Sequence, residues 1–156
     1  MLHNGESFPE LEVPAVGGGR LLLPSALAGS WGVVLLYRGA WCPYCHAQLA
    51  DFGRASDTLT ELGIKVAALS VDDEETSAAL VEKYRLGFPV GHSADAAKVS
   101  ASVGAYTNQD PPYLQSTGFV LAPAGTVVTA LYSSGAIGRL VADDVAGLVR
   151  YITSHS

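Results

Sequence analysis

The sequence is poor in residues that stabilise small secreted scaffolds or bind metals. Its 156 residues include two cysteines, one methionine and four histidines. A disulfide-rich scaffold needs several spaced cysteine pairs, so this class is excluded. A structural zinc site takes about four ligands, and neither a second Cys-x-x-Cys nor a His-x-x-x-His pair is present to complete one. We therefore expect no metal and no other cofactor.

Charged residues are also scarce, at 15% of the chain, with 9 basic against 15 acidic residues and a net charge of −6. The basic residues are scattered singly, so a cationic footprint for nucleic acid is missing and nucleic-acid binding is excluded. No run of about 18 apolar residues could span a membrane, and no signal peptide is visible. We expect a soluble cytoplasmic protein. With 49% hydrophobic residues, residues 1–156 are expected to form a single domain.

The N-terminal part of the chain alternates between extended and helical patterns. Apolar runs at Leu11–Val16 and Arg20–Leu23 flank three glycines, which is typical of a β-hairpin. The continuous apolar run Val33–Tyr37 predicts a strand buried on both faces. Apolar residues at helical spacing over Pro43–Leu62 predict one helix, and Gly63 is its expected C-terminal stop.

The rest of the chain continues the alternation. Asp72 or Asp73 is expected to cap a helix, and Asn108–Pro112 has the composition of a turn. The expected elements are a strand at Ile64–Val71, helices to about Arg85 and over Ala94–Val103, a hairpin of Phe119–Leu121 with Thr126–Tyr132, and a helix over Asp143–Arg150. Strands that alternate with helices, followed by a late antiparallel hairpin, indicate an α/β domain.

The two cysteines form a Cys-x-x-Cys motif, Cys42-Pro43-Tyr44-Cys45, between a buried strand and a helix. If Cys42 is the N-cap, Pro43 occupies the first helical position, where its missing N–H has no cost. The free N–H groups of the first turn and the helix dipole would then stabilise a Cys42 thiolate and lower its pKa. Cys45, one turn further on, is close enough to form a disulfide with it. The motif predicts a redox centre.

The motif has two other interpretations. Cys42 to His46 also spells Cys-x-x-Cys-His, the haem c attachment string, but that chemistry needs export and the chain offers no methionine axial ligand beyond Met1. His46 is therefore expected on the exposed side of the first helical turn, and His92 on the surface or in a loop. The remaining alternative is a pair of inert buried cysteines.

Three segments carry a resemblance to known proteins. They are Tyr37-Arg38-Gly39-Ala40-Trp41-Cys42-Pro43-Tyr44-Cys45, Phe88-Pro89-Val90, and the segment from Ser116 to Gly125, with Phe8-Pro9 and Leu11 as an entry strand. Over most of the chain they resemble thioredoxin-fold proteins and, more closely, the peroxiredoxin family of alkyl hydroperoxide reductases and thiol-specific antioxidants. The resemblance implies a thioredoxin-like α/β fold, with a central mixed β-sheet flanked by helices and an N-terminal β-hairpin.

The resemblance is uneven at the site. Arg38 stands where the family has proline, Cys42 where it has threonine, and Ser116 where it has its site arginine. Cys45 falls on the family's peroxide-attacking cysteine, whereas helix-end electrostatics favour Cys42. In thioredoxins a tryptophan also precedes the motif, as Trp41 does here, but the thioredoxin cis-proline is missing. The sequence leaves open which sulfur attacks and which of the two activities the protein has.

Three more residues are candidates for the site. Arg38 could hold positive charge near the thiolate and a peroxide oxygen, or be an ordinary exposed arginine. Trp41 could pack over the site and limit access of water, or be purely structural. Thr117 could make backbone or hydroxyl contacts near the sulfurs.

Three functions compete. The first is a thiol peroxidase that reduces hydroperoxides through a sulfenic acid and a Cys42–Cys45 disulfide. The second is a thioredoxin-like reductase of protein disulfides, and the third is a non-enzymatic redox-sensing or partner-binding domain. The resemblance implies a thiol reductant such as a thioredoxin- or glutaredoxin-type protein, and homodimers are common in the family.

Overall fold

The N-terminal hairpin is confirmed. In the computed structural model, which describes residues 1–155, β1 (Leu11–Pro14) pairs antiparallel with β2 (Arg20–Leu23). The connecting glycines 17, 18 and 19 all have positive φ, a region that glycine adopts without steric cost. Alternate residues of both strands are buried, so one side of the hairpin packs on the protein. A short 3₁₀ turn, η1 (Ser25–Leu27), follows.

A five-stranded mixed sheet forms the centre of the protein, in the order β5-β4-β3-β8-β9. The central strand β3 is parallel to β4 and antiparallel to β8. The strands are β3 (Trp31–Leu36), β4 (Ile64–Leu69), β5 (Val90–Gly91), β8 (Thr117–Leu121) and β9 (Val127–Tyr132). The residues at 33–36 are fully buried, as their continuous apolar run predicts for a strand covered on both faces.

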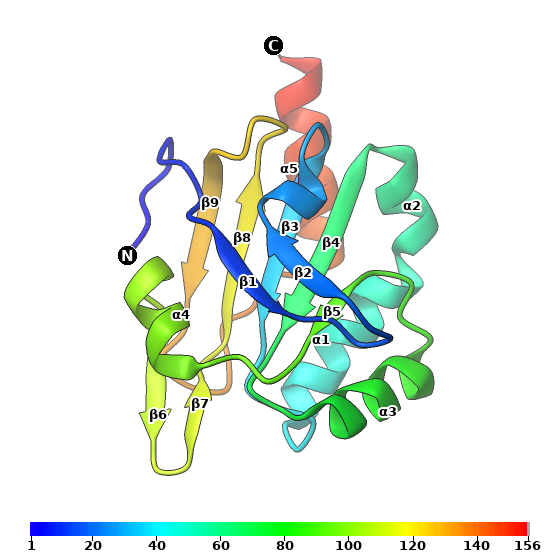
Figure 1. Ribbon diagram of the computed structural model, residues 1–156. Coiled ribbons are helices and arrows are strands. Elements are labelled where there is room, and N and C mark those ends of the chain that lie inside the picture. The colour runs from blue at the N-terminus through cyan, green and yellow to red at the C-terminus, as the bar shows by residue number, and fades with distance from the viewer. Residues whose placement is uncertain (156) are drawn as a thin grey trace.

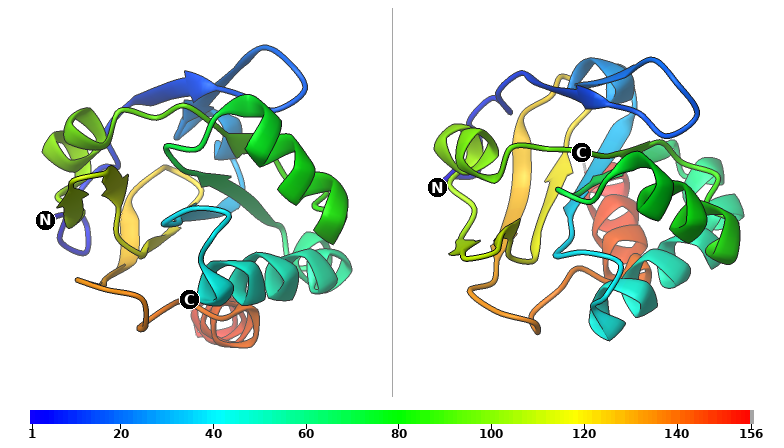
Figure 2. Two further views of the ribbon diagram at one scale, coloured as in Figure 1. Left: turned by 90° about the horizontal axis from the view of Figure 1, so that it is seen from below. Right: turned by 60° about the horizontal axis from the view of Figure 1, so that its bottom comes forward.

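The two faces of the sheet are covered differently (Figures 1 and 2). On one face, α1 and α5 pack against β3 in a core that includes Leu49, Phe52 and Val145. On the other face, the β1–β2 hairpin and α4 cover Val34 and Leu36. The carboxyl end of β3 leads directly into the start of α1, at the lower end of the sheet in Figure 1. Both cores therefore support the segment that carries the cysteines.

The predicted single helix from Pro43 to Leu62 is wrong. The chain forms α1 (Pro43–Arg54) and then α2 (Ser56–Glu61), because Ala55 leaves the helical region with φ −84° and ψ 3°. The break redirects the chain so that Leu59 stays in the core beside β4. Gly63, with φ 73°, ends α2 as predicted.

The remaining helices form near their predicted positions, and the predicted cap of α3 is confirmed. Asp73 accepts a hydrogen bond from the Thr76 amide at 2.8 Å at the start of α3 (Glu74–Tyr84). Asp95 caps α4 (Ala96–Val103), and α5 covers Ala142–Ser154. The turn predicted at residues 108–112 is the tip of a small separate hairpin that the sequence patterns did not indicate. Its strands are β6 (Thr107–Gln109) and β7 (Pro112–Leu114).

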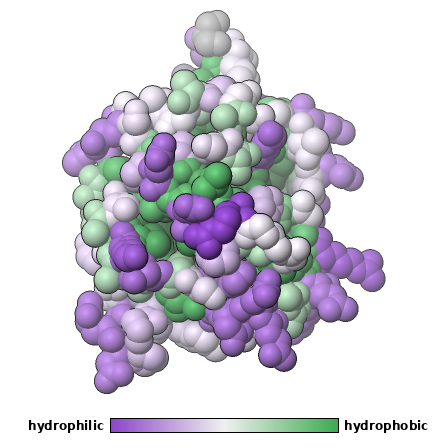
Figure 3. All heavy atoms as spheres, in the orientation of Figure 1, coloured by the Kyte–Doolittle hydropathy of each residue, from purple (hydrophilic) through white to green (hydrophobic). Residues whose placement is uncertain are grey.

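Figure 3 shows the face that bears the N-terminal hairpin, where hydrophilic side chains (purple) surround a hydrophobic area (green). The green area shows that apolar atoms remain at the surface between the hydrophilic groups, as is usual for a folded protein. Across residues 1–155, none of the helices has both the length and the apolar character needed to cross a bilayer.

Candidate active site

Both cysteines lie where β3 gives way to α1, and both are free thiols whose side chains are fully buried. Cys42 has extended backbone angles and is the N-cap of α1, with Pro43 in the first turn, as predicted. Its sulfur accepts a hydrogen bond from the Cys45 amide at 3.3 Å. Local sequence therefore places one sulfur on the free N–H groups of the helix and the other one turn later.

Arg139 is the principal residue that sequence reasoning missed. It lies in the loop between β9 and α5, which Figure 2 shows running past the start of α1. Its Nη2 is 3.5 Å from Cys42 Sγ and 3.3 Å from Cys45 Sγ. Nη1 donates to Gln48 Oε1 at 3.3 Å, and Nε donates to the Ala136 carbonyl at 3.0 Å. Ser116 stands where the family has its site arginine, and Arg139, from a later loop, supplies the positive charge instead.

The signal that could have identified Arg139 was weak. It is a lone cation in a stretch of small residues between the last strand and the last helix, Ser133-Ser134-Gly135-Ala136-Ile137-Gly138. Nothing in that pattern indicates a partner 97 residues earlier in the chain.

Arg38 lies beside the pair, as expected. Its backbone N–H donates to Cys45 Sγ at 3.3 Å, and its Nη1 is 3.9 Å from Cys42 Sγ. The other guanidinium nitrogens donate to Gln115 Oε1 at 3.0 Å and to the Tyr113 hydroxyl at 3.2 Å. The cysteine pair is therefore flanked by two arginines from different parts of the chain.

The surroundings of the two sulfurs separate their pKa values. Burial by itself would raise the pKa of Cys42, but hydrogen bonds from Cys45, the charge of Arg139 and a hydrogen bond from Arg38 outweigh burial and lower it. Burial, together with the hydrogen bond that the Cys45 thiol gives to Cys42, raises the pKa of Cys45 to about 11. Of the two sulfurs, Cys42 therefore ionises first, while Cys45 keeps its proton.

Trp41 and Thr117 hold different places at the site. Trp41 is 55% exposed and stacks over the Arg38 guanidinium, with 4.8 Å from its ring centroid to Arg38 Cζ. Its ring meets Tyr113 edge-on at 5.0 Å. Thr117 is buried in β8 and its hydroxyl donates to the Gln115 carbonyl at 3.0 Å. Thr117 thus adjoins the site through Gln115, and its contact with a sulfur stays a prediction.

The loop before Cys42 is held from the opposite side. The Ala40 amide donates to Asp72 Oδ2 at 2.8 Å, and burial raises the pKa of this carboxyl. The Ala40 carbonyl contacts His46 Nε2, and His46 Nδ1 lies 3.1 Å from the Tyr84 hydroxyl. The expectation that His46 is exposed is therefore wrong: it is half-buried because Ala40 and Tyr84 hold both ring nitrogens.

His92 lies in the loop after β5, one of the two expected places, but it is not on the surface. It is buried, with Nδ1 2.8 Å from the Ser93 hydroxyl and Nε2 3.6 Å from the Glu74 carboxylate. Within residues 1–155 no three His, Cys, Asp or Glu side chains are grouped so that they could hold a metal ion.

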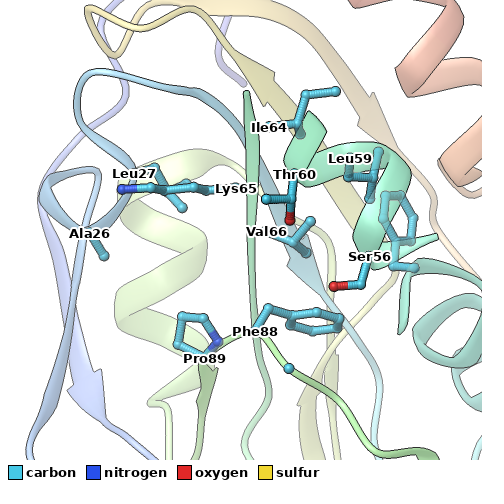
Figure 4. A pocket seen from close by; sticks show the side chains of 12 residues that line it. Ala26, Leu27, Ser56, Leu59, Thr60, Ile64, Lys65, Val66, Phe88 and Pro89 are labelled. Atoms are coloured by element: carbon cyan, nitrogen blue, oxygen red, sulfur yellow. The ribbon is translucent and has the colours of Figure 1, made fainter. Parts of the chain in front are cut away.

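The hollow drawn in Figure 4 lies away from the cysteines. It is lined by η1, α2, the first half of β4 and the Phe88-Pro89 segment. Ile64, one of its lining residues, pairs with Trp31 at the beginning of β3. Cys42 follows the other end of that strand, so this hollow and the sulfurs lie at opposite ends of the sheet.

A cysteine pair at the start of the first long helix, next to the central strand of a thioredoxin-like sheet and flanked by arginines, defines the class of thiol-dependent oxidoreductases. Comparison with known proteins gives the family. The profile of the AhpC/TSA family matches residues 4–130, and the chain belongs to this family.

The relatives include a peroxiredoxin of Treponema denticola, 28% identical over 156 residues, which covers 96% of this chain and 74% of the relative. A peroxiredoxin of Methanothermobacter marburgensis is 26% identical over 147 residues, with 90% and 68% covered. The chain is accordingly a thiol peroxidase, and this hypothesis fits better than a disulfide reductase or a non-enzymatic domain.

Solved structures share the fold. Peroxiredoxin 6 of Arenicola marina superposes with a TM-score of 0.84 at 17% identity, covering 98% of this chain and 74% of its own. Peroxidoxin BcpB of Mycobacterium tuberculosis gives 0.83 at 20% identity, covering 97% and 99%. The predicted thioredoxin-like α/β fold is confirmed.

Proposed function

We propose that this thiol peroxidase reduces hydroperoxides with Cys42 as the attacking thiolate and Cys45 as the resolving thiol. The observation that supports this assignment is that Cys42 Sγ accepts hydrogen bonds from Cys45, in addition to its contacts with the two arginines. The Cys45 amide lies at 3.3 Å, Arg139 Nη2 at 3.5 Å and Arg38 Nη1 at 3.9 Å. These groups favour the thiolate, which is the nucleophilic form of cysteine.

In the first step the Cys42 thiolate attacks one peroxide oxygen. A sulfur–oxygen bond forms as the O–O bond breaks, so that Cys42 becomes a sulfenic acid and the peroxide leaves as an alkoxide, or as hydroxide from hydrogen peroxide. The alkoxide takes a proton from water and departs as the alcohol. Arg139 and Arg38 stabilise the negative charge as it moves from sulfur to the leaving oxygen.

In the second step the Cys45 thiol attacks the Cys42 sulfenic acid. The S–S bond forms, and the sulfenic oxygen leaves as water together with the Cys45 proton. The high pKa of Cys45 suits this order, because Cys45 keeps its proton while Cys42 is the thiolate. An external dithiol then reduces the disulfide and restores both thiols.

Site-specific trapping of the sulfenic acid distinguishes attack by Cys42 from attack by Cys45. The family resemblance favours Cys45. Reduced Cys42→Ser and Cys45→Ser proteins are treated with one equivalent of hydrogen peroxide or an organic hydroperoxide in the presence of dimedone, and the adduct is mapped by mass spectrometry. We expect a sulfenic acid on Cys42 in Cys45→Ser and slow oxidation of Cys42→Ser. Rapid trapping on Cys45 in the Cys42→Ser protein would reverse the assignment, and oxidation no faster than that of free cysteine would end the peroxidase proposal.

Further parts of the proposal follow the family. We propose that residues 1–156 act as one domain in the cytoplasm, and that the reductant is a thioredoxin- or glutaredoxin-type protein. Homodimers are proposed on the same ground. Turnover assays with each reductant, and sedimentation at several protein concentrations, test these points independently of the chemistry at Cys42.

A further inference from the structure

Arg38 is contacted by two side chains from one part of the chain. Tyr113 belongs to the small β6–β7 hairpin, and Gln115 follows it. We infer that Tyr113 and Gln115 are positioning residues, which hold the guanidinium of Arg38 beside the Cys42 sulfur. The inference rests on the proposed function, in which Cys42 is the attacking thiolate. It adds residues that no motif at the cysteines indicates, since Gln115 lies 77 residues from Arg38 in sequence.

The hydrogen bonds of Arg38 fix the direction of its free edge. Nε donates to Gln115 Oε1 at 3.0 Å and Nη2 donates to the Tyr113 hydroxyl at 3.2 Å. Because a guanidinium is planar and rigid, two fixed nitrogens determine the place of the third. That third nitrogen, Nη1, is the one that lies 3.9 Å from Cys42 Sγ. Because this contact is already long, a rotation of the guanidinium that moved Nη1 further away would weaken its interaction with the Cys42 sulfur.

Tyr113 is itself held on both sides. It pairs with Asn108 across the β6–β7 hairpin. Its ring meets Trp41 edge-on at 5.0 Å and lies under the Arg38 guanidinium, with 5.3 Å from Arg38 Cζ to the ring centroid. The Arg38 guanidinium therefore packs against two aromatic rings that also contact each other, an arrangement that favours a cation.

Gln115 is fixed by its backbone. Its N–H donates to the Tyr106 carbonyl at 2.8 Å, and its carbonyl accepts the Thr117 hydroxyl at 3.0 Å. The residue is buried, so its amide oxygen needs a partner inside the protein, and Arg38 supplies one. The same pairing occurs at the second arginine, where buried Gln48 accepts from Arg139. Each arginine at the sulfurs is thus oriented by a glutamine.

The test is the pH dependence of Cys42 alkylation in the full reduced chain, with iodoacetamide and mass-spectrometric mapping of the modified sulfur. Tyr113→Phe removes one hydroxyl, and Gln115→Met removes the amide at similar volume. Both are made alone, together, and in an Arg38→Met background. Gln109→Ala is the matched control, because Gln109 is exposed in the same hairpin and bonds to Thr107.

We expect Tyr113→Phe/Gln115→Met to raise the alkylation midpoint by about 0.5 on the pH scale, as a nearby cation shifts a pKa by about one to three. In the Arg38→Met background the same pair should cause no further change, because residues that act through one partner are not additive. Gln109→Ala should match the wild type. The Tyr113→Phe protein carries the test if the double variant does not fold, since it loses a single atom.

Two results would overturn the positioning role and leave the proposed function intact. One is a midpoint unchanged by the hairpin variants while Arg38→Met raises it. The other is an equal rise with and without Arg38, which would mean that the hairpin acts on Cys42 by another route. An unchanged midpoint in Arg38→Met would remove Arg38 from the proposed mechanism, and the positioning role with it. Peroxide oxidation at the rate of free cysteine would instead refute the peroxidase proposal.

Discussion

Arg139→Met is the substitution whose effect can be worked most directly from the structure. It removes a positive charge 3.5 Å from Cys42 Sγ while keeping most of the aliphatic side chain. Two unit charges at about 4 Å interact by about 1 kcal/mol in water and about 4 kcal/mol at an effective dielectric constant of about 20. Because Arg139 is half-exposed, the lower end of that range applies.

We therefore expect the pKa of Cys42 to rise by about one, equivalent to about 1.4 kcal/mol. At a pH below the wild-type midpoint, the thiolate population falls about tenfold, and alkylation and peroxide oxidation slow in proportion. The assay is stopped-flow oxidation by hydrogen peroxide, with alkylation followed in parallel from pH 5 to about 10. At a pH well above both midpoints, the alkylation rates of variant and wild type should converge.

Two controls separate the charge from the fold. Arg139→Lys keeps the charge and should recover part of the lost reactivity, although lysine cannot reproduce the geometry of the guanidinium. Arg150→Met removes an exposed arginine of α5 and should leave the alkylation midpoint unchanged. The electrostatic reasoning would be refuted by an Arg139→Met profile that overlays the wild type, or by an equal shift in Arg150→Met.

Three further predictions concern pH and packing. Between pH 9 and 11 the free energy of unfolding should fall more steeply in the wild type than in Cys45→Ala, because the pKa of Cys45 is normal in the unfolded chain but about 11 in the folded protein. Urea titrations that give both proteins the same pH dependence of this free energy would contradict the prediction. In Gly39→Ala the new Cβ would lie 2.3 Å from Trp41 Nε1, so the exposed Trp41 ring must move and tryptophan fluorescence should change. The free energy of unfolding should fall by less than about 1 kcal/mol. An unaltered fluorescence spectrum would contradict this prediction. Gly91→Ala, whose Cβ would lie 2.4 Å from a valine of β1, should lose about 1–3 kcal/mol, whereas Gly87→Ala meets nothing within 4 Å and should lose almost none; equal losses would be inconsistent with the packing.

Much of the fold could be predicted because its signals are local. The glycines between β1 and β2, the apolar run of β3 and the aspartate caps of α3 and α4 each act within a few residues. The continuation of α1 to Leu62 was predicted wrongly for the same reason. Helical spacing persists across Ala55, and only packing of Leu59 beside β4 shows that the axis changes direction there.

The candidate site divides in the same way. The sequence by itself determined that Cys42 is the N-cap of a helix, that Pro43 is the first helical residue and that Cys45 follows one turn later. Capping and helical spacing depend on neighbouring residues. It also indicated Arg38, which directly follows the buried strand. It left open which sulfur is the thiolate, since both belong to the same helical turn.

Tertiary structure separates the pKa values of the two sulfurs by bringing distant groups to the pair. Arg139 reaches the sulfurs from 97 residues away, and Gln115 orients Arg38 from 77 residues away. Side chains so far apart meet only through the register of β3 with β8 and the path of the loop after β9, and no local pattern encodes either. The sequence determined where the redox centre is; the folded chain set its charge, because electrostatic interactions depend on distance in space and not on separation along the chain.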